Sequence, residues 1–153
     1  EMPDIKIVET GNGTIMISLP ESILFASGEA RVRPEALPFL KSLAQILIEM
    51  DRHVRILGHT DNVPIRTAQF PSNWELSAVR AVMVVRIFSE LYEVPITHLS
   101  ATGFADSKPV ATNDTPEGRT KNRRVEIIIL EKTLTEETLD SMLPGAPPPA
   151  MPF

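Results

Sequence analysis

The first hydrophobic residues of the chain alternate with other residues as they do in a β-strand. Isoleucine stands at every second position in 5–7 and again in 15–17, which places it on one face of a strand. Between these runs, Gly11, Asn12 and Gly13 are residue types that tolerate the positive φ angles of tight hairpin turns. The pattern predicts a two-stranded hairpin, followed by an irregular connection over 21–32.

Two longer segments change to the three- and four-residue spacing of helices. Large apolar residues recur at that spacing between 37 and 50, and Pro34 suits a first helical turn, so a helix is predicted over 34–51. A second helix is predicted over 73–92, because Ser72 and Glu75 have the spacing of a capping box at its start.

Strands are predicted over 53–61, 99–106 and 123–130, with a short helical turn or loop over 115–122. The order strand, helix, strand favours a parallel pair, because such a connection crosses over the sheet. Together these elements predict an α+β fold. It is a two-layer βαβαβ sandwich, with two long helices packed on one face of a mixed sheet.

The predicted elements divide the chain into four segments. An N-terminal hairpin and connecting segment, 1–33, leads into a core of 34–131. A C-terminal helix is predicted within 132–143. The tail 144–153 has five prolines in ten residues and is predicted to be extended or disordered.

Composition narrows the classes of function. A net charge of −5 and a pI of about 5.2 argue against a general nucleic-acid binder, which would be basic. The chain has no cysteine, and its three histidines lack the spacing of metal ligands, so we expect neither a metal site nor another cofactor. No apolar run approaches the roughly 20 residues that span a bilayer. Because the chain opens with "EMPD", we interpret it as a fragment without its targeting segment.

One positive charge lies inside the apolar run 79–85 of the second helix. A guanidinium that is at least half-buried, as expected for Arg80, needs an anion or several acceptors. Asn73 lies almost two turns earlier on the same face, about 10 Å away. Asp61 ends the preceding strand, where binding sites of α/β sheets gather. Two interpretations stay open: a site for a ligand with both an ammonium and a carboxylate group, or an internal Asp61–Arg80 salt bridge with Asn73 capping the helix.

These residues belong to a longer pattern, spread over 53–130. The pattern resembles that of the OmpA-like peptidoglycan-binding family, and the stretches "GHTDNVPI", "FPSNWELS" and "LFASGEARVRPEA" most resemble its branch of MotB-like flagellar stator proteins. The matching positions are Thr60, Asp61, Asn73, Leu76, Ser77, Arg80, Ala81, Gly103, Asn113, Gly118, Arg119, Asn122, Arg123, Arg124 and Val125.

The resemblance implies a ligand, the meso-diaminopimelate of the peptidoglycan stem peptide with the neighbouring glycan. The positions implied to contact it are Thr60, Asp61, Asn73, Arg80, Arg123 and Arg124. Asp61 and Arg80 would hold the zwitterionic end of diaminopimelate. One of Arg123 and Arg124 would reach the peptide or the rim; Arg123 is favoured, but the sequence does not separate the two. Trp74 would either stack on a sugar or anchor the loop.

The resemblance also implies partners and a location. Stator proteins of this branch are single-pass inner-membrane proteins, and this chain would be their periplasmic portion, acting as a homodimer with a MotA-like partner. The expected function is that of a non-catalytic anchor that holds a flagellar stator to the cell wall. The alternatives are a wall-binding protein unrelated to motility and a peptidoglycan hydrolase. The hydrolase is disfavoured because Ser77 lies mid-helix, outside any nucleophile turn.

Overall fold

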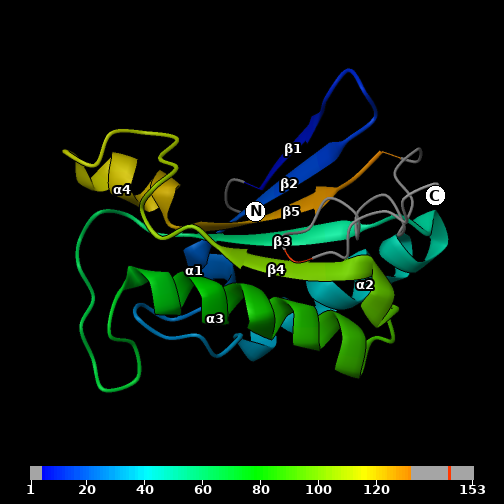
Figure 1. The fold of residues 1–153 in the computed structure, drawn as a ribbon, viewed down its shortest axis with the longest axis horizontal. Helices are drawn as coiled ribbons and strands as arrows, with labels where there is room; N and C mark the ends of the chain where they lie inside the picture. Colours follow the sequence, from blue (N-terminus) through cyan, green and yellow to red (C-terminus); the bar gives the residue numbers. More distant parts are fainter. Residues whose placement is uncertain (1–4, 132–144, 146–153) are drawn as a thin grey trace, which may run out of the picture.

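The computed structural model describes residues 5–131 and 145, and these form five strands and four α-helices (Figure 1). The strands are β1 (Lys6–Glu9), β2 (Ile15–Pro20), β3 (Val54–His59), β4 (Leu99–Gly103) and β5 (Arg124–Ile129). The α-helices are α1 (Glu21–Leu24), α2 (Leu37–Met50), α3 (Asn73–Arg86) and α4 (Pro116–Asn122). Short 3₁₀ turns cover Pro34–Ala36 and Ile96–His98, and a π-helical turn covers Ile87–Leu91.

The strands form one mixed sheet in the order β1-β2-β5-β3-β4. Strands β3 and β4 are parallel neighbours, and the other three pairings are antiparallel. The sequence favoured a parallel pair across the first helix, but β5 lies between β2 and β3 and pairs with both. Five of the six residues of β5 are buried, and such a strand is stabilised most at the centre of a sheet.

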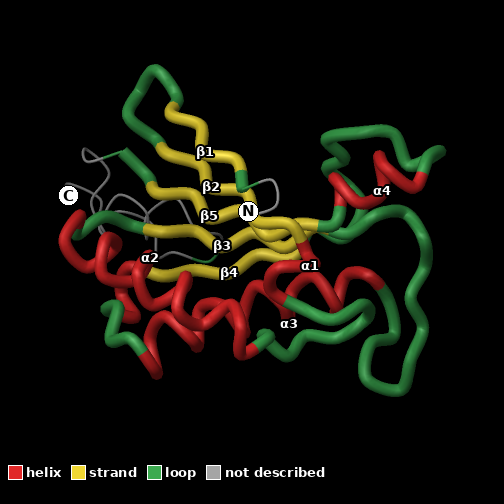
Figure 2. Tube along the Cα trace, turned by 180° about the vertical axis from the view of Figure 1, so that it is seen from behind, coloured by secondary structure: helices red, strands yellow, loops and turns green. Residues whose placement is uncertain are grey.

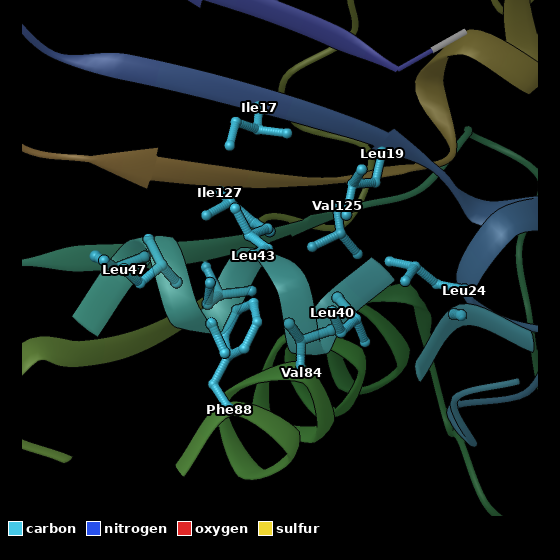
Figure 3. Close-up of a cluster of buried hydrophobic side chains, with 14 of the residues drawn as sticks. Ile17, Leu19, Leu24, Leu40, Leu43, Leu47, Val84, Phe88, Val125 and Ile127 are labelled. Carbon is cyan, nitrogen blue, oxygen red and sulfur yellow. The ribbon is translucent and has the colours of Figure 1, made fainter. Parts of the chain in front are cut away.

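Helices α2 and α3 pack on one face of the sheet (Figures 1 and 2), so the predicted α+β two-layer arrangement is confirmed. The core lies between the two layers. In Figure 3, side chains from β2 and β5 point toward those from α2 and α3, among them Ile17, Ile127, Leu43 and Phe88. Of these four, Ile127 and Phe88 are fully buried.

Two glycines allow α3 to lie directly against the strands beneath it. A Cβ added to Gly58 of β3 would lie 2.1 Å from the carbonyl oxygen of Ser77. A Cβ added to Gly103 of β4 would lie 2.4 Å from the nitrogen of Ala78. Because helix backbone meets strand backbone at both points, the height of α3 above the sheet is fixed, and with it the position of every side chain that α3 carries.

The predicted strands and helices that fall within the described residues are present, with differences at their ends. The second helix changes from α to π geometry after Arg86. The segment 21–32 was predicted to be irregular, and this prediction is wrong at its start, where the short helix α1 lies. It starts at Glu21 because Pro20 sets an extended N-cap and the N–H of Phe25 closes the turn on the carbonyl of Glu21. The segment predicted as helical turn or loop is α4. The predicted C-terminal helix over 132–143 and nearly all of the tail 144–153 lie outside the described residues.

Within the described ranges, no helix combines the length and the apolar character that crossing a bilayer requires.

Candidate ligand-binding cavity

A cavity of about 400 Å³ lies where β3 ends and α3 begins, which is within the usual size of small-molecule sites. Its walls come from segments far apart in the sequence. The lining residues are Glu21, Ser27, Gly28, Thr60, Asp61, Val63, Pro64, Ile65, Asn73, Leu76, Arg80, Arg119 and Arg123. Five of the six predicted contact positions are therefore brought together in one hollow.

Asp61 stabilises the first turn of the loop that follows β3. Its Oδ1 accepts a hydrogen bond of 3.0 Å from the N–H of Val63, which closes a tight turn. Asn73, the first residue of α3, donates from Nδ2 to the carbonyl of Val63 at 3.0 Å and to that of Asp61 at 3.4 Å. The cap itself is Ser72, whose Oγ accepts from the N–H of Trp74 and bonds Glu75, so the predicted capping box is present. Asn73 thus holds the loop instead of capping the helix.

Arg80 is buried, with 3% of its surface exposed, as its apolar surroundings in the sequence predicted. Its Nε donates to the carbonyl of Glu29 at 2.7 Å, and its Nη2 donates to the carbonyl of Ala26 at 3.3 Å. The same Nη2 lies 2.8 Å from Oε1 of Glu21. The guanidinium carbon also lies 4.9 Å from the centre of the Phe25 ring, at cation–π distance. Arg80 therefore ties the segment that follows α1 to α3.

Arg123 links the remaining charges. Its Nη1 donates to Oδ2 of Asp61 and its Nε to Oε2 of Glu21, each at 2.7 Å. Burial by itself would lower the pKa of the Arg123 guanidinium, but the hydrogen bonds to Asp61 and Glu21 outweigh it, so the pKa is raised. The charges alternate in the order Asp61, Arg123, Glu21, Arg80. The interpretation that Asp61 and Arg80 form a direct salt bridge is wrong. Arg80 pairs with Glu21, and Asp61 pairs with Arg123.

Two charged residues that line the cavity, Arg119 and Glu21, were absent from the predicted contacts. Arg119 of α4 donates from Nη1 to the carbonyl of Asn113 at 2.8 Å; it belongs to the quoted pattern, so the pattern held a signal for it. The sequence held no signal for Glu21, because this residue lies in a segment predicted as irregular and its partners are distant in the sequence.

Arg124 lies elsewhere. Its exposed fraction is 6%, and it donates to Oε2 of Glu126 and to the carbonyls of Asn122 and Lys108 at 3.0–3.2 Å. Arg123 and Arg124 diverge because successive side chains at the start of a strand point to opposite sides. Of the two arginines that the sequence did not separate, Arg123 lines the cavity.

A buried polar cluster accompanies Arg124 on the sheet face opposite the helices. Nε2 of His59 lies 2.6 Å from Oε1 of Glu126, and the His59 ring stacks on Phe104 with centroids 5.3 Å apart. Burial would raise the pKa of Glu126, but the hydrogen bond with His59 and the charge of Arg124 hold it below its ordinary value. In the part of the chain that is described, no group of three or more His, Cys, Asp or Glu side chains is placed to bind a metal ion.

A second hollow of about 490 Å³ adjoins the first and shares Pro64, Ile65 and Asn73 with it. Trp74 lines this second hollow and is 56% exposed. The ring is thus largely available to solvent, which limits its part in anchoring the loop.

The sequence model of the OmpA family matches residues 24–123, about two thirds of the chain. The chain belongs to the OmpA family. The match includes every residue that lines the first cavity except Glu21.

Among relatives, this OmpA-family chain is 43% identical to Motility protein B of Bacillus subtilis (strain 168) over 123 residues, which are 80% of this chain and 47% of that protein. It is 30% identical to Motility protein B of Helicobacter pylori (strain J99) over 132 residues, covering 79% and 51% of the two chains. The chain thus spans about half the length of these curated relatives.

A solved structure of similar fold is the cell wall anchor of the T6SS from Pseudomonas aeruginosa, with a TM-score of 0.78, 36% identity and coverage of 84% of this chain and 88% of that one. The periplasmic domain of Helicobacter pylori MotB has a TM-score of 0.75 and 26% identity, with coverage of 88% and 87%.

Proposed function

We propose that this domain is a non-catalytic anchor that binds peptidoglycan in the cavity between β3 and α3. The observation that carries the proposal is the gathering of Asp61, Arg80 and Arg123 in one hollow. An alternation of carboxylate and guanidinium groups suits a ligand that has both an ammonium and a carboxylate group. The zwitterionic end of meso-diaminopimelate in the stem peptide has these two groups.

In the proposed complex, the ligand ammonium bonds to Asp61, and the ligand carboxylate bonds to Arg80 and Arg123. Thr60 and Asn73 stand beside Asp61 and orient the ligand. Arg123 is favoured over Arg124 because it lines the cavity, whereas Arg124 is engaged on the opposite face of the sheet. The domain would work by resisting a pulling force rather than by turning over a substrate.

The finer role that we propose is in the flagellar stator, with the domain in the periplasm, as a homodimer that acts with a MotA-like partner. The relative named Motility protein B, at 43% identity, supports this role. The similarity to a cell wall anchor of a secretion system supports a second candidate, a wall anchor outside motility. Both candidates share the same peptidoglycan site. Swarming by cells that carry the full-length gene, with and without changes in the cavity, separates them.

The test of wall binding is sedimentation with purified sacculi, with released muropeptides measured in the same tubes. Asp61→Asn and Arg80→Ala should reduce the fraction of protein that sediments with the sacculi. The binding free energy should weaken by about 2–5 kcal/mol, the cost of removing one partner of a desolvated charge contact. Arg86→Ala is the matched control, because Arg86 lies on the same helix but its side chain is 55% exposed and pairs with Glu90.

Folded cavity variants that sediment like the original protein would refute the site. Sustained release of muropeptides would instead support the hydrolase that the sequence disfavoured.

A further inference from the structure

The carboxylate of Glu21 lies inside the proposed site, between two of its arginines. Its Oε1 is 2.8 Å from Nη2 of Arg80, and its Oε2 is 2.7 Å from Nε of Arg123. Its side chain is 13% exposed. These are the same two guanidinium groups that the ligand carboxylate would require.

We propose that Glu21 occupies the place of the ligand carboxylate and determines which ligand ends the site accepts; this inference rests on the proposed function. A ligand binds fully when its own carboxylate displaces that of Glu21 from Arg80 and Arg123. A ligand end with an ammonium but no carboxylate reaches Asp61 alone and leaves Glu21 in place. Glu21 therefore competes with the carboxylate of the ligand but not with its ammonium group.

The structure allows the Glu21 side chain to leave without unfolding the wall. Arg80 holds the following segment through the backbone carbonyls of Ala26 and Glu29, not through Glu21 alone. Those two bonds persist when the carboxylate rotates away. Arg123, the second partner, is about one-third exposed at its side chain, so the path of the carboxylate leads toward solvent.

The charges that line the cavity determine which ligands gain when Glu21 is neutralised. Three guanidinium groups, on Arg80, Arg119 and Arg123, face two carboxylates, on Glu21 and Asp61. When Glu21 is made neutral, Asp61 remains to hold an ammonium, and the arginines are left for an incoming carboxylate. The gain in affinity should therefore be confined to ligands that carry a carboxylate next to the side-chain ammonium.

The experiment compares two synthetic stem tripeptides that differ in one group. One ends in meso-diaminopimelate, and the other ends in lysine, which keeps the side-chain ammonium but lacks the adjacent carboxylate. Calorimetric titration of the whole 153-residue chain should show that Glu21→Gln binds the diaminopimelate peptide roughly five- to tenfold more tightly. The lysine peptide should change by less than about twofold.

The matched control is Glu35→Gln, the same charge change on an exposed side chain outside the cavity lining, which should leave both affinities unchanged. Glu21→Asp keeps the charge but is one methylene shorter and cannot bridge both arginines, so it should shift affinity in the same direction by less. If Glu21→Gln fails to fold, the direction of the Glu21→Asp shift decides.

Equal tightening toward both peptides, or unchanged or weaker binding of the diaminopimelate peptide by a folded variant, overturns the role of Glu21 and leaves the proposed function standing. Failure of the unaltered chain to bind either peptide or sacculi overturns both.

Discussion

Replacing Gly58 by alanine should force α3 away from the sheet. The added Cβ would lie 2.1 Å from the carbonyl oxygen of Ser77, 2.9 Å from its carbonyl carbon and 3.2 Å from its Cα. All three atoms are helix backbone, so rotation of a side chain cannot relieve the overlap. The helix must move, although it also lies close to β4, where a Cβ added to Gly103 would be 2.4 Å from the nitrogen of Ala78.

Overpacking of a well-packed core costs about 1–3 kcal/mol, and occasionally more. We expect the upper end of that range, about 3 kcal/mol, because backbone is displaced on both sides of the contact. The free energy of unfolding is measured by urea titration followed by circular dichroism, with the slope m checked for a two-state transition. The displacement also moves Asn73 and Arg80, so affinity for the diaminopimelate peptide should fall together with stability.

The matched control is Gly11→Ala in the hairpin turn, where an added Cβ meets no atom within 4 Å. Its free energy of unfolding should stay within about 0.5 kcal/mol of the original. If Gly58→Ala is as stable as Gly11→Ala, α3 does not rest on β3 as described, and the placement of Arg80 in the cavity fails with it.

Two further predictions concern buried polar groups. The pKa of Glu126 is held below its ordinary value of 4.5 in the folded protein, so its contribution is complete above the unfolded-state pKa and is lost as pH falls through the folded-state pKa. The urea midpoint of the original protein should therefore fall more steeply below about pH 4.5 than that of Glu126→Gln, and equal slopes would contradict the pairing with His59. The fully buried Asn122 accepts the N–H groups of Val110 and Ala111 at Oδ1, at 2.8 and 3.0 Å. Asn122→Ala should cost about 2–3 kcal/mol and speed hydrogen exchange of those two amides, whereas unchanged exchange would show that the loop does not depend on this side chain.

Periodicity predicted the helices because their apolar stripes are local. The spacing at 37–50 predicted α2, and the capping box predicted the first residue of α3. The burial of Arg80 also followed from the sequence, because a charge within an apolar helical run must share the burial of its neighbours. The position of β5 was missed although a signal existed, since the apolar run 127–130 is typical of a strand at the centre of a sheet.

The salt-bridge partners of Arg80 and Asp61 could not be predicted from the sequence. A guanidinium in an apolar run requires acceptors, but nothing in the pattern indicates which ones. Arg80 takes Glu21 and two carbonyls from a segment without periodicity, and Asp61 takes Arg123 from the far end of the pattern. Such contacts depend on β5, because its first residue, Arg124, pairs with Pro20 of β2 on one side and with His59 of β3 on the other. This arrangement is set by the sheet order and not by any local spacing.

The edge strand β1 has a consequence for anyone who shortens this chain. It has four residues, all exposed, and charged Lys6 and Glu9 stand at its two ends, which is how natural sheets discourage pairing with other molecules. A version that starts after the hairpin turn would leave β2 at the border, six residues long and rich in isoleucine and leucine. Such a version would aggregate more readily at high concentration, even though every residue that lines the cavity at the end of β3 would be kept.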